Sequence, residues 1–443
     1  MAARKKRKKK NKTGLFFMTL AATVIPGIAF LMVCWTLQEI KSMPVSATVA
    51  QGEAANLEGE GVRAAGMIQE SETSAGVLEG NMGDEAAENG FSAGGDVEDP
   101  TQGEPASGKY GDILADPEAM ARDNIHVVVP ASPNEVTLTF AGDILFDGGY
   151  SIMAKMKNRA GEAVENYVET AFDEPMRNAM RSADIFMVNN EFTYTNRGAP
   201  TEDKKFTFRA RPEHASLLLD MGADIVSLAN NHTYDYGEIS LLDTLDTLTA
   251  IGMPYVGAGR NLAEAVRPVY FIAGDVKIAF LSATQIERMD NPSTRGATEN
   301  SAGVFRCRNV DLLLEKVTEA KAVSDYVVVY IHWGTESTTE LDWAQKEQAP
   351  KIAEAGADLI IGDHPHVLQG IGWCGQTPVI YSLGNYLFNS KTQDTCLITV
   401  TLDTHTGERK SVRFIPALQQ DCRTVMHMGV EKQRVIQNML EMS

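Results

Sequence analysis

Cysteine and basic charge are both scarce in this chain. Its 443 residues include five cysteines, and no two of them have the C-x-x-C spacing of a cysteine zinc site. Lys and Arg number 40 against 59 Asp and Glu, a formal net charge of −19. This balance argues against a nucleic-acid surface as the main function. Four of the cysteines leave room for one or two disulfides that the sequence cannot pair: Cys307, Cys374, Cys396 and Cys422.

Charge is missing altogether from residues 14–37, a run of 24 positions. A helix of that length spans a bilayer core of about 30 Å. The first dozen residues hold eight Lys or Arg, so the positive-inside bias puts residues 1–13 in the cytoplasm and everything after residue 37 outside the cell. The alternative is a cleaved signal peptide, but its apolar core is normally about 7–15 residues. We therefore expect a single-pass protein of the cell membrane with an extracellular C-terminal domain.

Aromatic residues are almost absent from residues 44–108, which contain 13 Asp or Glu and one basic residue, Arg63. Such a segment cannot bury enough apolar surface to fold. The sequence therefore predicts an acidic disordered stalk over residues 38–133 and a folded domain over residues 134–443. An acidic binding tail is the alternative for the stalk.

From about Asn134 onward, apolar runs alternate with amphipathic stretches, which predicts βαβ units and an α/β fold. Turn residues at Gly274-Asp275 and Thr406-Gly407 predict two hairpins, so the sheets should be mixed. Near-continuous apolar runs such as VVVYI indicate strands that are covered on both faces.

Polar residues stand at the carboxyl ends of five of these apolar runs, where α/β proteins bind ligands. The set is Asp143, Glu191, Asn231 with His232, His332, and His364 with His366. His364 and His366 are two residues apart, so an extended segment would point both imidazoles the same way. A single histidine at a strand end is more often a satisfied core group, and only the joint arrangement points to a site at one edge.

Carboxylate, amide and imidazole ligands suit Mn²⁺, Fe or Zn²⁺. One zinc ion takes about four ligands, and this set contains more. The alternative is a pair of ions about 3.5–4 Å apart that share a carboxylate. Arg209 in FRARPE would clamp a carboxylate or phosphate, or form a surface salt bridge.

The ordered motifs AGDILF, NNEF, FRARPE, SLANNHTYDYG, HWGTE, GADLIIGDHPHVLQG and YSLGNYLF resemble the CapA-type capsule-synthesis family, which is associated with poly-γ-glutamate. The resemblance runs from about Val136 to Phe388, and that family is similar in turn to calcineurin-like metallophosphoesterases. It implies two central mixed sheets flanked by helices, on the outer face of a bacterial membrane. The implied partners are an anionic exopolymer or a phosphoester substrate and other membrane subunits of a polymer synthase.

The resemblance also implies a role for each residue. Asp143 and His366 would bind a first metal ion and Glu191 would bridge two ions. Asn231, His332 and His364 would bind the second ion, and His232 would be the general acid. Glu336 and Asn385 would line the substrate site, although Asn385 could simply shape a turn.

Three positions depart from the metallophosphoesterase pattern. Leu145 stands where a histidine ligand is usual, and Glu191 stands where the bridging group is usually aspartate. Asp363 precedes the HPH motif in place of a histidine, either to orient an imidazole or as a loop residue. Three functions stay open: a capsule or poly-γ-glutamate accessory protein, an extracellular metal-dependent phosphoesterase, and a non-catalytic polymer-binding module.

Overall fold

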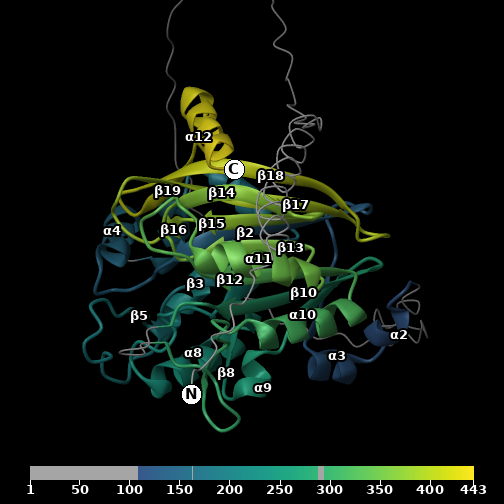
Figure 1. Cartoon of the computed structure of the whole chain (residues 1–443). Helices are drawn as coiled ribbons and strands as arrows, with labels where there is room; N and C mark the ends of the chain where they lie inside the picture. The colour runs from purple at the N-terminus through teal and green to yellow at the C-terminus, as the bar shows by residue number, and fades with distance from the viewer. Residues whose placement is uncertain (1–107, 162, 288–293) are drawn as a thin grey trace, which may run out of the picture. The chain divides into compact units, whose positions relative to one another are not determined.

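Two β-sheets form the centre of the structure, a computed structural model that describes residues 108–161, 163–287 and 294–443. The first sheet has the strand order β1-β9-β10-β12-β13-β15-β14. The second has the order β19-β18-β17-β2-β3-β6-β7, with β16 beside β2 (Figure 1). Parallel and antiparallel pairs occur in both sheets, which confirms the predicted mixed α/β architecture.

The strands have the following bounds. The first sheet consists of β1 (Ile125–Val128), β9 (Val269–Ala273), β10 (Val276–Thr284), β12 (Tyr326–His332), β13 (Leu359–Asp363), β14 (Leu368–Cys374) and β15 (Thr377–Leu383). The second consists of β2 (Glu135–Ile144), β3 (Ile185–Asn190), β6 (Ile225–Ser227), β7 (Tyr255–Val256), β16 (Asn385–Leu387), β17 (Gln393–Asp403), β18 (Arg409–Gln420) and β19 (Arg423–Met426). Two short ladders pair β4 (Thr193–Tyr194) with β5 (Arg209–Ala210) and β8 (Ala258–Gly259) with β11 (Gly303–Val304).

Helices cover the outer faces of both sheets. On the first sheet lie α10 (Asp311–Val323) and α11 (Trp343–Glu354). On the second lie α4 (Ser151–Ala160), α5 (Tyr167–Ala171), α6 (Glu174–Arg181), α7 (Ser216–Met221) and α8 (Glu238–Ala250). The C-terminal helix α12 (Gly429–Met442), yellow in Figure 1, contacts β14 and β18, one strand of each sheet. The remaining helices are α2 (Gly111–Leu114), α3 (Pro117–Asp123), η1 (Val164–Asn166), η2 (Pro212–Ala215) and α9 (Leu262–Ala265).

One hydrophobic core lies between the two sheets, where alternate residues of β2 point toward the first sheet. Val136, Leu138 and Phe140 are fully buried there, and they share one cluster with Phe280 of β10 and Tyr330 of β12. Each fully buried side chain of this size contributes about 1.5–3 kcal/mol to folding. This packing fixes the ends of β2 and β12 relative to each other.

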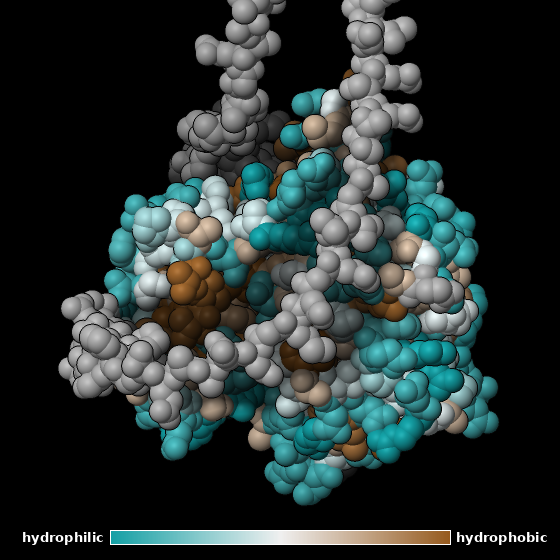
Figure 2. All heavy atoms as spheres, turned by 180° about the vertical axis from the view of Figure 1, so that it is seen from behind, coloured by the Kyte–Doolittle hydropathy of each residue, from teal (hydrophilic) through white to brown (hydrophobic). Residues whose placement is uncertain are grey.

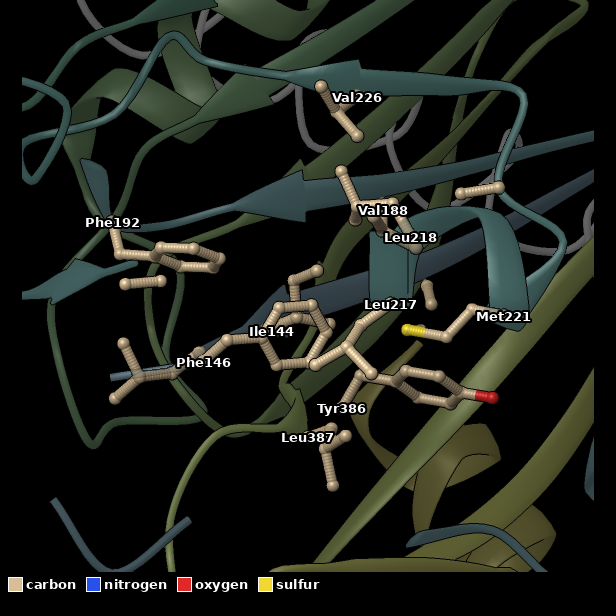
Figure 3. Close-up of a cluster of buried hydrophobic side chains, with 14 of the residues drawn as sticks. Ile144, Phe146, Val188, Phe192, Leu217, Leu218, Met221, Val226, Tyr386 and Leu387 are labelled. Carbon is tan, nitrogen blue, oxygen red and sulfur yellow. The ribbon is translucent and has the colours of Figure 1, made fainter. Parts of the chain in front are cut away.

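A second cluster lies on the outer face of the second sheet. Figure 3 shows Val188 and Val226 of neighbouring strands pointing toward Leu217 and Leu218 of α7. Ile144 and Phe192 in the same cluster adjoin Asp143 and Glu191 in the chain. Burial of these apolar neighbours therefore anchors the backbone next to two of the predicted site residues.

An aspartate precedes each of four parallel strands and binds the backbone of the neighbouring strand at two points. Both bonds go to one residue of the neighbouring strand. The aspartate carboxylate accepts the N–H of that residue at 2.7–2.8 Å, and the aspartate N–H donates to its carbonyl. The pairs are Asp184 with Thr137, Asp224 with Phe186, Asp325 with Lys277, and Asp358 with Val327. These four aspartates thus set strand register at the amino ends, opposite the predicted site.

The folded domain begins earlier than the predicted boundary at Asn134. Helices α2 and α3 and strand β1 fall within residues 108–133, and β1 pairs with β9 in parallel. The segment was misassigned because its short elements are tied down by distant partners, such as Tyr110, whose hydroxyl donates to Asp325. The rest of the predicted stalk and the predicted anchor at residues 14–37 lie outside the described residues. Within the described residues, none of the helices is both long and apolar enough to cross a bilayer.

The surface is mainly hydrophilic on the face shown in Figure 2, where hydrophobic atoms gather in a few hollows.

The four cysteines of the described part, Cys307, Cys374, Cys396 and Cys422, are all free, so the suggested disulfides do not form among them.

Candidate metal centre

Polar side chains from the ends of five strands come together where the two sheets face each other. They are Asp143 in β2, Glu191 after β3, Asn231 and His232 after β6, His332 at the end of β12, and His364 and His366 after β13. The sequence predicted that they share one sheet edge. Instead the second sheet supplies those from β2, β3 and β6, and the first sheet supplies the rest.

A β-bulge aims Asp143 into this region. The register between β2 and β3 shifts between Phe140 and Asp143, so two residues of β2 face one residue of β3. The Tyr330 hydroxyl of the opposite sheet donates to the carbonyl of Ala141 within the bulge, at 2.8 Å. Asp143 is fully buried, and Asn189 of β3 donates to its Oδ1 at 2.8 Å.

The Asp143 group consists of Asp143, Asn385 and His366. The Nδ1 atom of His366 lies 3.0 Å from Asp143 Oδ2 and 2.9 Å from Asn385 Oδ1. Burial raises the pKa of Asp143, but its neighbours, His366 foremost and then His332 and Asp363, together outweigh burial and the net shift is downward. Burial lowers the pKa of His366, and its contact with Asp143 reverses that effect.

The His332 group consists of His332, Asn231 and His364. The Nε2 atom of His332 lies 2.8 Å from Asn231 Oδ1 and 3.0 Å from His364 Nδ1. Burial lowers the pKa of His332 to about 3 and that of His364 well below its ordinary value. Both imidazoles are therefore neutral at physiological pH, which is the form that binds a metal ion.

Glu191 lies between the two groups. Its Oε1 is 3.5 Å from His332 Nε2, and its Oε2 is 4.0 Å from His366 Nδ1. The side chain is fully buried, and neither oxygen has a hydrogen-bond partner among the described residues. Burial, with Asp143 and Asp363 nearby, raises the pKa of Glu191 well above its ordinary value. A buried carboxylate without partners is costly unless a cation completes its surroundings.

The donor set fits one or two divalent ions. Each group offers an imidazole and an amide oxygen within about 3 Å of each other, and Glu191 turns one free oxygen toward each group. Glu191, His364 and His366 have ligand atoms within 4.8 Å of one another, as do Asp143, His332 and Asp363. Their role as metal ligands stays a prediction, and the residue types do not select one metal among Mn²⁺, Fe and Zn²⁺.

Asp363 orients an imidazole and is not a free loop residue. It is the last residue of β13, fully buried, and its Oδ1 lies 2.9 Å from His332 Nδ1. A proton on Nδ1 shared with Asp363 leaves Nε2 of His332 free to face Asn231 and His364.

The segment after β13 is not extended, contrary to the sequence prediction. His364 has a φ of 93° and His366 a φ of 58°, both in the left-handed region. Because the chain turns at each residue, the two imidazoles lie in different groups, His364 in the His332 group and His366 in the Asp143 group. Their ring centroids are 5.8 Å apart.

His232 lies beside both groups and is held by a buried carboxylate. Its Nδ1 is 2.6 Å from Asp235 Oδ2, and its Nε2 is 4.0 Å from Glu191 Oε1. The ammonium of Lys204 binds Asp235 Oδ1 and the backbone carbonyl of Asn231. Burial lowers the pKa of His232, although Asp235 opposes that shift.

Two predicted substrate-binding residues lie outside the donor groups. The Arg209 guanidinium lies over the Tyr236 ring at 4.4 Å and forms no salt bridge with any described residue. Glu336 is exposed, but its charge helps to raise the pKa values of Glu191 and His366, so it is near the site. The third predicted residue, Asn385, is buried within the Asp143 group.

Sequence reasoning missed four residues that contact the site. Asn189 and Asp235 carry a local signal, since they lie two residues before Glu191 and three residues after His232. Lys204 and Gln393 carry none, because they reach the site only through the fold.

The site opens to solvent at one side. The His366 side chain is 20% exposed, and Asn231 is partly exposed. These exposed parts are where a ligand can reach the two donor groups. A groove of about 420 Å³ is lined in part by Val367, the residue after His366, and by Gln393 and residues of α12, but by no member of either donor group.

The family described as "Bacterial capsule synthesis protein PGA_cap" matches residues 137–390. The "PGA biosynthesis protein CapA" of Bacillus subtilis is 31% identical over 275 residues, 60% of this chain and 68% of that protein. The "Capsule biosynthesis protein CapA" of Bacillus anthracis is 29% identical over 60% of this chain and 63% of that protein. The chain thus spans about two thirds of the length of these relatives.

Among solved structures, a phosphatase of Mycoplasma pneumoniae is 15% identical, with a TM-score of 0.40, and the match covers 65% of this chain and 95% of that one. A likeness at this level carries no argument about activity.

Proposed function

The chain belongs to the bacterial capsule synthesis protein family PGA_cap, and from this membership we propose that it is an extracellular accessory protein of poly-γ-glutamate capsule synthesis or export. The names of two relatives, both from capsule or PGA biosynthesis, support the proposal. Residues 14–37 would anchor it in the bacterial membrane, close to the membrane subunits of a polymer synthase.

The single observation that carries the role of the site is the buried Glu191 carboxylate, whose two free oxygens face two donor groups. Asp143, Glu191 and His366 would hold one divalent ion, and Glu191, Asn231, His332 and His364 a second. A bound ion would act as a Lewis acid toward an anionic oxygen of the ligand.

The chain's own residues provide a proton donor beside this site. Asp235 accepts a hydrogen bond from Nδ1–H of His232, which directs Nε2 toward Glu191. Asp235 also favours the protonated imidazolium form of His232 against burial. In that form Nε2 carries a second proton, which is the one that would go to a leaving oxygen; in the neutral form Nε2 has a lone pair and would accept a proton instead.

Asp147 accepts the backbone N–H of Arg209 at 2.7 Å. The Arg209 guanidinium lies over the Tyr236 ring and has no salt bridge within the described part, so it is available to bind a carboxylate or phosphate of the ligand.

A genetic experiment tests the role of the site. Deletion of the gene should abolish capsular polymer, and the wild-type gene should restore it. His366→Ala, made at equal protein level, should fail to restore it because it removes a member of the Asp143 group. His405→Ala is the matched control, since His405 lies exposed in the β17–β18 hairpin. Full rescue by His366→Ala would reject a site-dependent role.

A metal-dependent phosphoesterase is the second candidate function, and the His232–Asp235 pair beside Glu191 favours it. The purified chain with Mn²⁺ should then hydrolyse a generic phosphodiester, and His232→Ala should lose most of that activity while it still binds metal. If the chain binds metal and polymer but no turnover is measured, the remaining reading is a non-catalytic polymer-binding module.

A further inference from the structure

Leu145 occupies the position where the related phosphoesterases usually have a histidine ligand. It is 2% exposed, and its backbone N–H donates to the carbonyl of Leu387 at 2.9 Å. Position 145 therefore supplies no ligand atom, and the Asp143 group would need a donor from another part of the chain.

Strand β16 brings such a donor next to Asp143. The backbone of Gly384 approaches β2 so closely that a Cβ on Gly142 would lie 1.9 Å from the Gly384 carbonyl oxygen. Only glycine at position 142 allows this contact. The Asp143 N–H donates to the same carbonyl at 3.2 Å, and Asn385 then pairs with Asp143 across a parallel bridge.

Hydrogen bonds fix the orientation of the Asn385 amide. Its Nδ2 donates to Gln393 Oε1 at 3.2 Å, and Gln393 Nε2 donates to the His366 carbonyl at 3.3 Å. Oδ1 is thereby turned toward the site, 2.9 Å from His366 Nδ1. The side chain is 2% exposed, so this acceptor is held inside the Asp143 group.

We propose that the Asn385 side-chain oxygen is a metal ligand that takes the place of the missing imidazole. This inference rests on the metal site of the proposed function and adds a ligand to it. The first ion would then have Asp143, Asn385, His366 and Glu191 as ligands. This set has three oxygens and one nitrogen, so it is harder than the donor set of the His332 group. The ion at the Asp143 group should therefore be Mn²⁺ rather than Zn²⁺.

Titration of the metal-free full chain, purified in detergent, with Mn²⁺ tests this proposal by calorimetry. Wild type should bind two ions. Asn385→Leu should lose one ion or bind it more than about 100-fold more weakly, beyond the 10–100-fold that loss of a residue supporting a ligand costs, whereas Asn385→Asp, which keeps an oxygen donor, should retain both. Asn438→Leu, at an exposed position of α12, is the matched control. Thermal unfolding of each metal-free variant separates loss of a ligand from loss of the fold.

The outcomes separate this inference from the function on which it rests. If wild type binds no ion, the metal site itself fails and the inference fails with it. If wild type binds metal and folded Asn385→Leu binds the same number of ions with unchanged affinity, only the role of Asn385 is overturned. Loss of affinity in Asn385→Leu that Asn385→Asp restores supports it.

Discussion

Glu191 is the residue whose surroundings depend most on a ligand. Its carboxylate has no hydrogen-bond partner among the described residues, and burial, with acidic side chains nearby, raises its pKa. In the metal-free protein this arrangement destabilises the fold, since at neutral pH the side chain is buried either as a charge without a partner or as an acid that must first take up a proton, and both cost free energy. The residue is therefore better explained by metal binding than by stability.

Glu191→Gln should raise the stability of the metal-free protein and reduce its stabilisation by Mn²⁺. The substitution keeps the shape of the side chain, and it removes the cost of protonating Glu191 on folding at neutral pH, a gain of about 1–3 kcal/mol from about 1.4 kcal/mol per unit of pKa difference. Thermal unfolding with and without Mn²⁺ measures both effects, with exposed Glu299→Gln as the control. If Glu191→Gln is less stable without metal and still gains as much from Mn²⁺, the explanation is wrong.

At the scale of elements, the loop between β4 and β5 is tied to the turn after β6. Lys204 reaches from the loop to Asp235 and to the Asn231 carbonyl, and the Phe208 N–H also donates to Asp235, at 2.6 Å. The Lys204 and Asp235 side chains are only 8% and 0% exposed. The loop thus holds a predicted ligand and the predicted proton donor in place.

Lys204→Met and Asp235→Asn should each cost about 3–5 kcal/mol, because each leaves the other charge buried without its partner. The double variant should cost less than the sum of the two, by about 0.5–3 kcal/mol. Urea unfolding measures all three free energies. Strictly additive effects would show that the two charges do not depend on each other.

Asp224, one of the aspartates that set strand register, should make stability depend on pH. Burial raises the pKa of Asp224 to about 6, against its hydrogen bond from Phe186. A raised pKa favours the protonated form in the folded state. The contribution of Asp224 to stability is therefore present below about pH 4 and lost as the pH rises through about 6.

The stability of Asp224→Asn relative to wild type should rise over this pH range. The change is at most about 3 kcal/mol, from about 1.4 kcal/mol per unit of pKa difference. Urea unfolding at several pH values between 4 and 7 measures it. A difference between the two proteins that does not change with pH would show that the Asp224 carboxyl titrates normally.

At the scale of the whole molecule, the site exists only when both sheets are packed together. Asp143, Glu191 and Asn231 come from the second sheet, while His332, His364 and His366 come from the first. A ligand that binds only the folded state adds about 2.7 kcal/mol of stability at 100 times its Kd. Metal binding and sheet packing should therefore stabilise each other.

The ordered segment before Asn134 should contribute to this packing. A fragment of residues 134–443 should unfold at a lower temperature than one of residues 108–443, because it lacks the β1–β9 pairing and the Tyr110–Asp325 hydrogen bond. Calorimetric unfolding of both fragments measures the difference. Equal unfolding temperatures would show that β1 adds no stability.

Much of the arrangement could be predicted from the sequence, because apolar runs reveal strands and parallel strands deliver their end residues to a shared region. The sequence could not reveal that two sheets would supply them, since the order of strands depends on long-range pairing. It also gave no sign that Asn385 would lie next to Asp143, because this contact follows from the close approach of Gly142 and Gly384. The left-handed turns at His364 and His366 were missed because neither residue is a glycine.

The most direct test of the account is the amount of divalent metal bound per chain after the full protein is dialysed against equal concentrations of Mn²⁺, Fe²⁺ and Zn²⁺. We predict two ions per wild-type chain by elemental analysis and fewer in both Glu191→Ala and His332→Ala. A wild-type protein that retains no ion, or variants that retain as many ions as wild type, would contradict it.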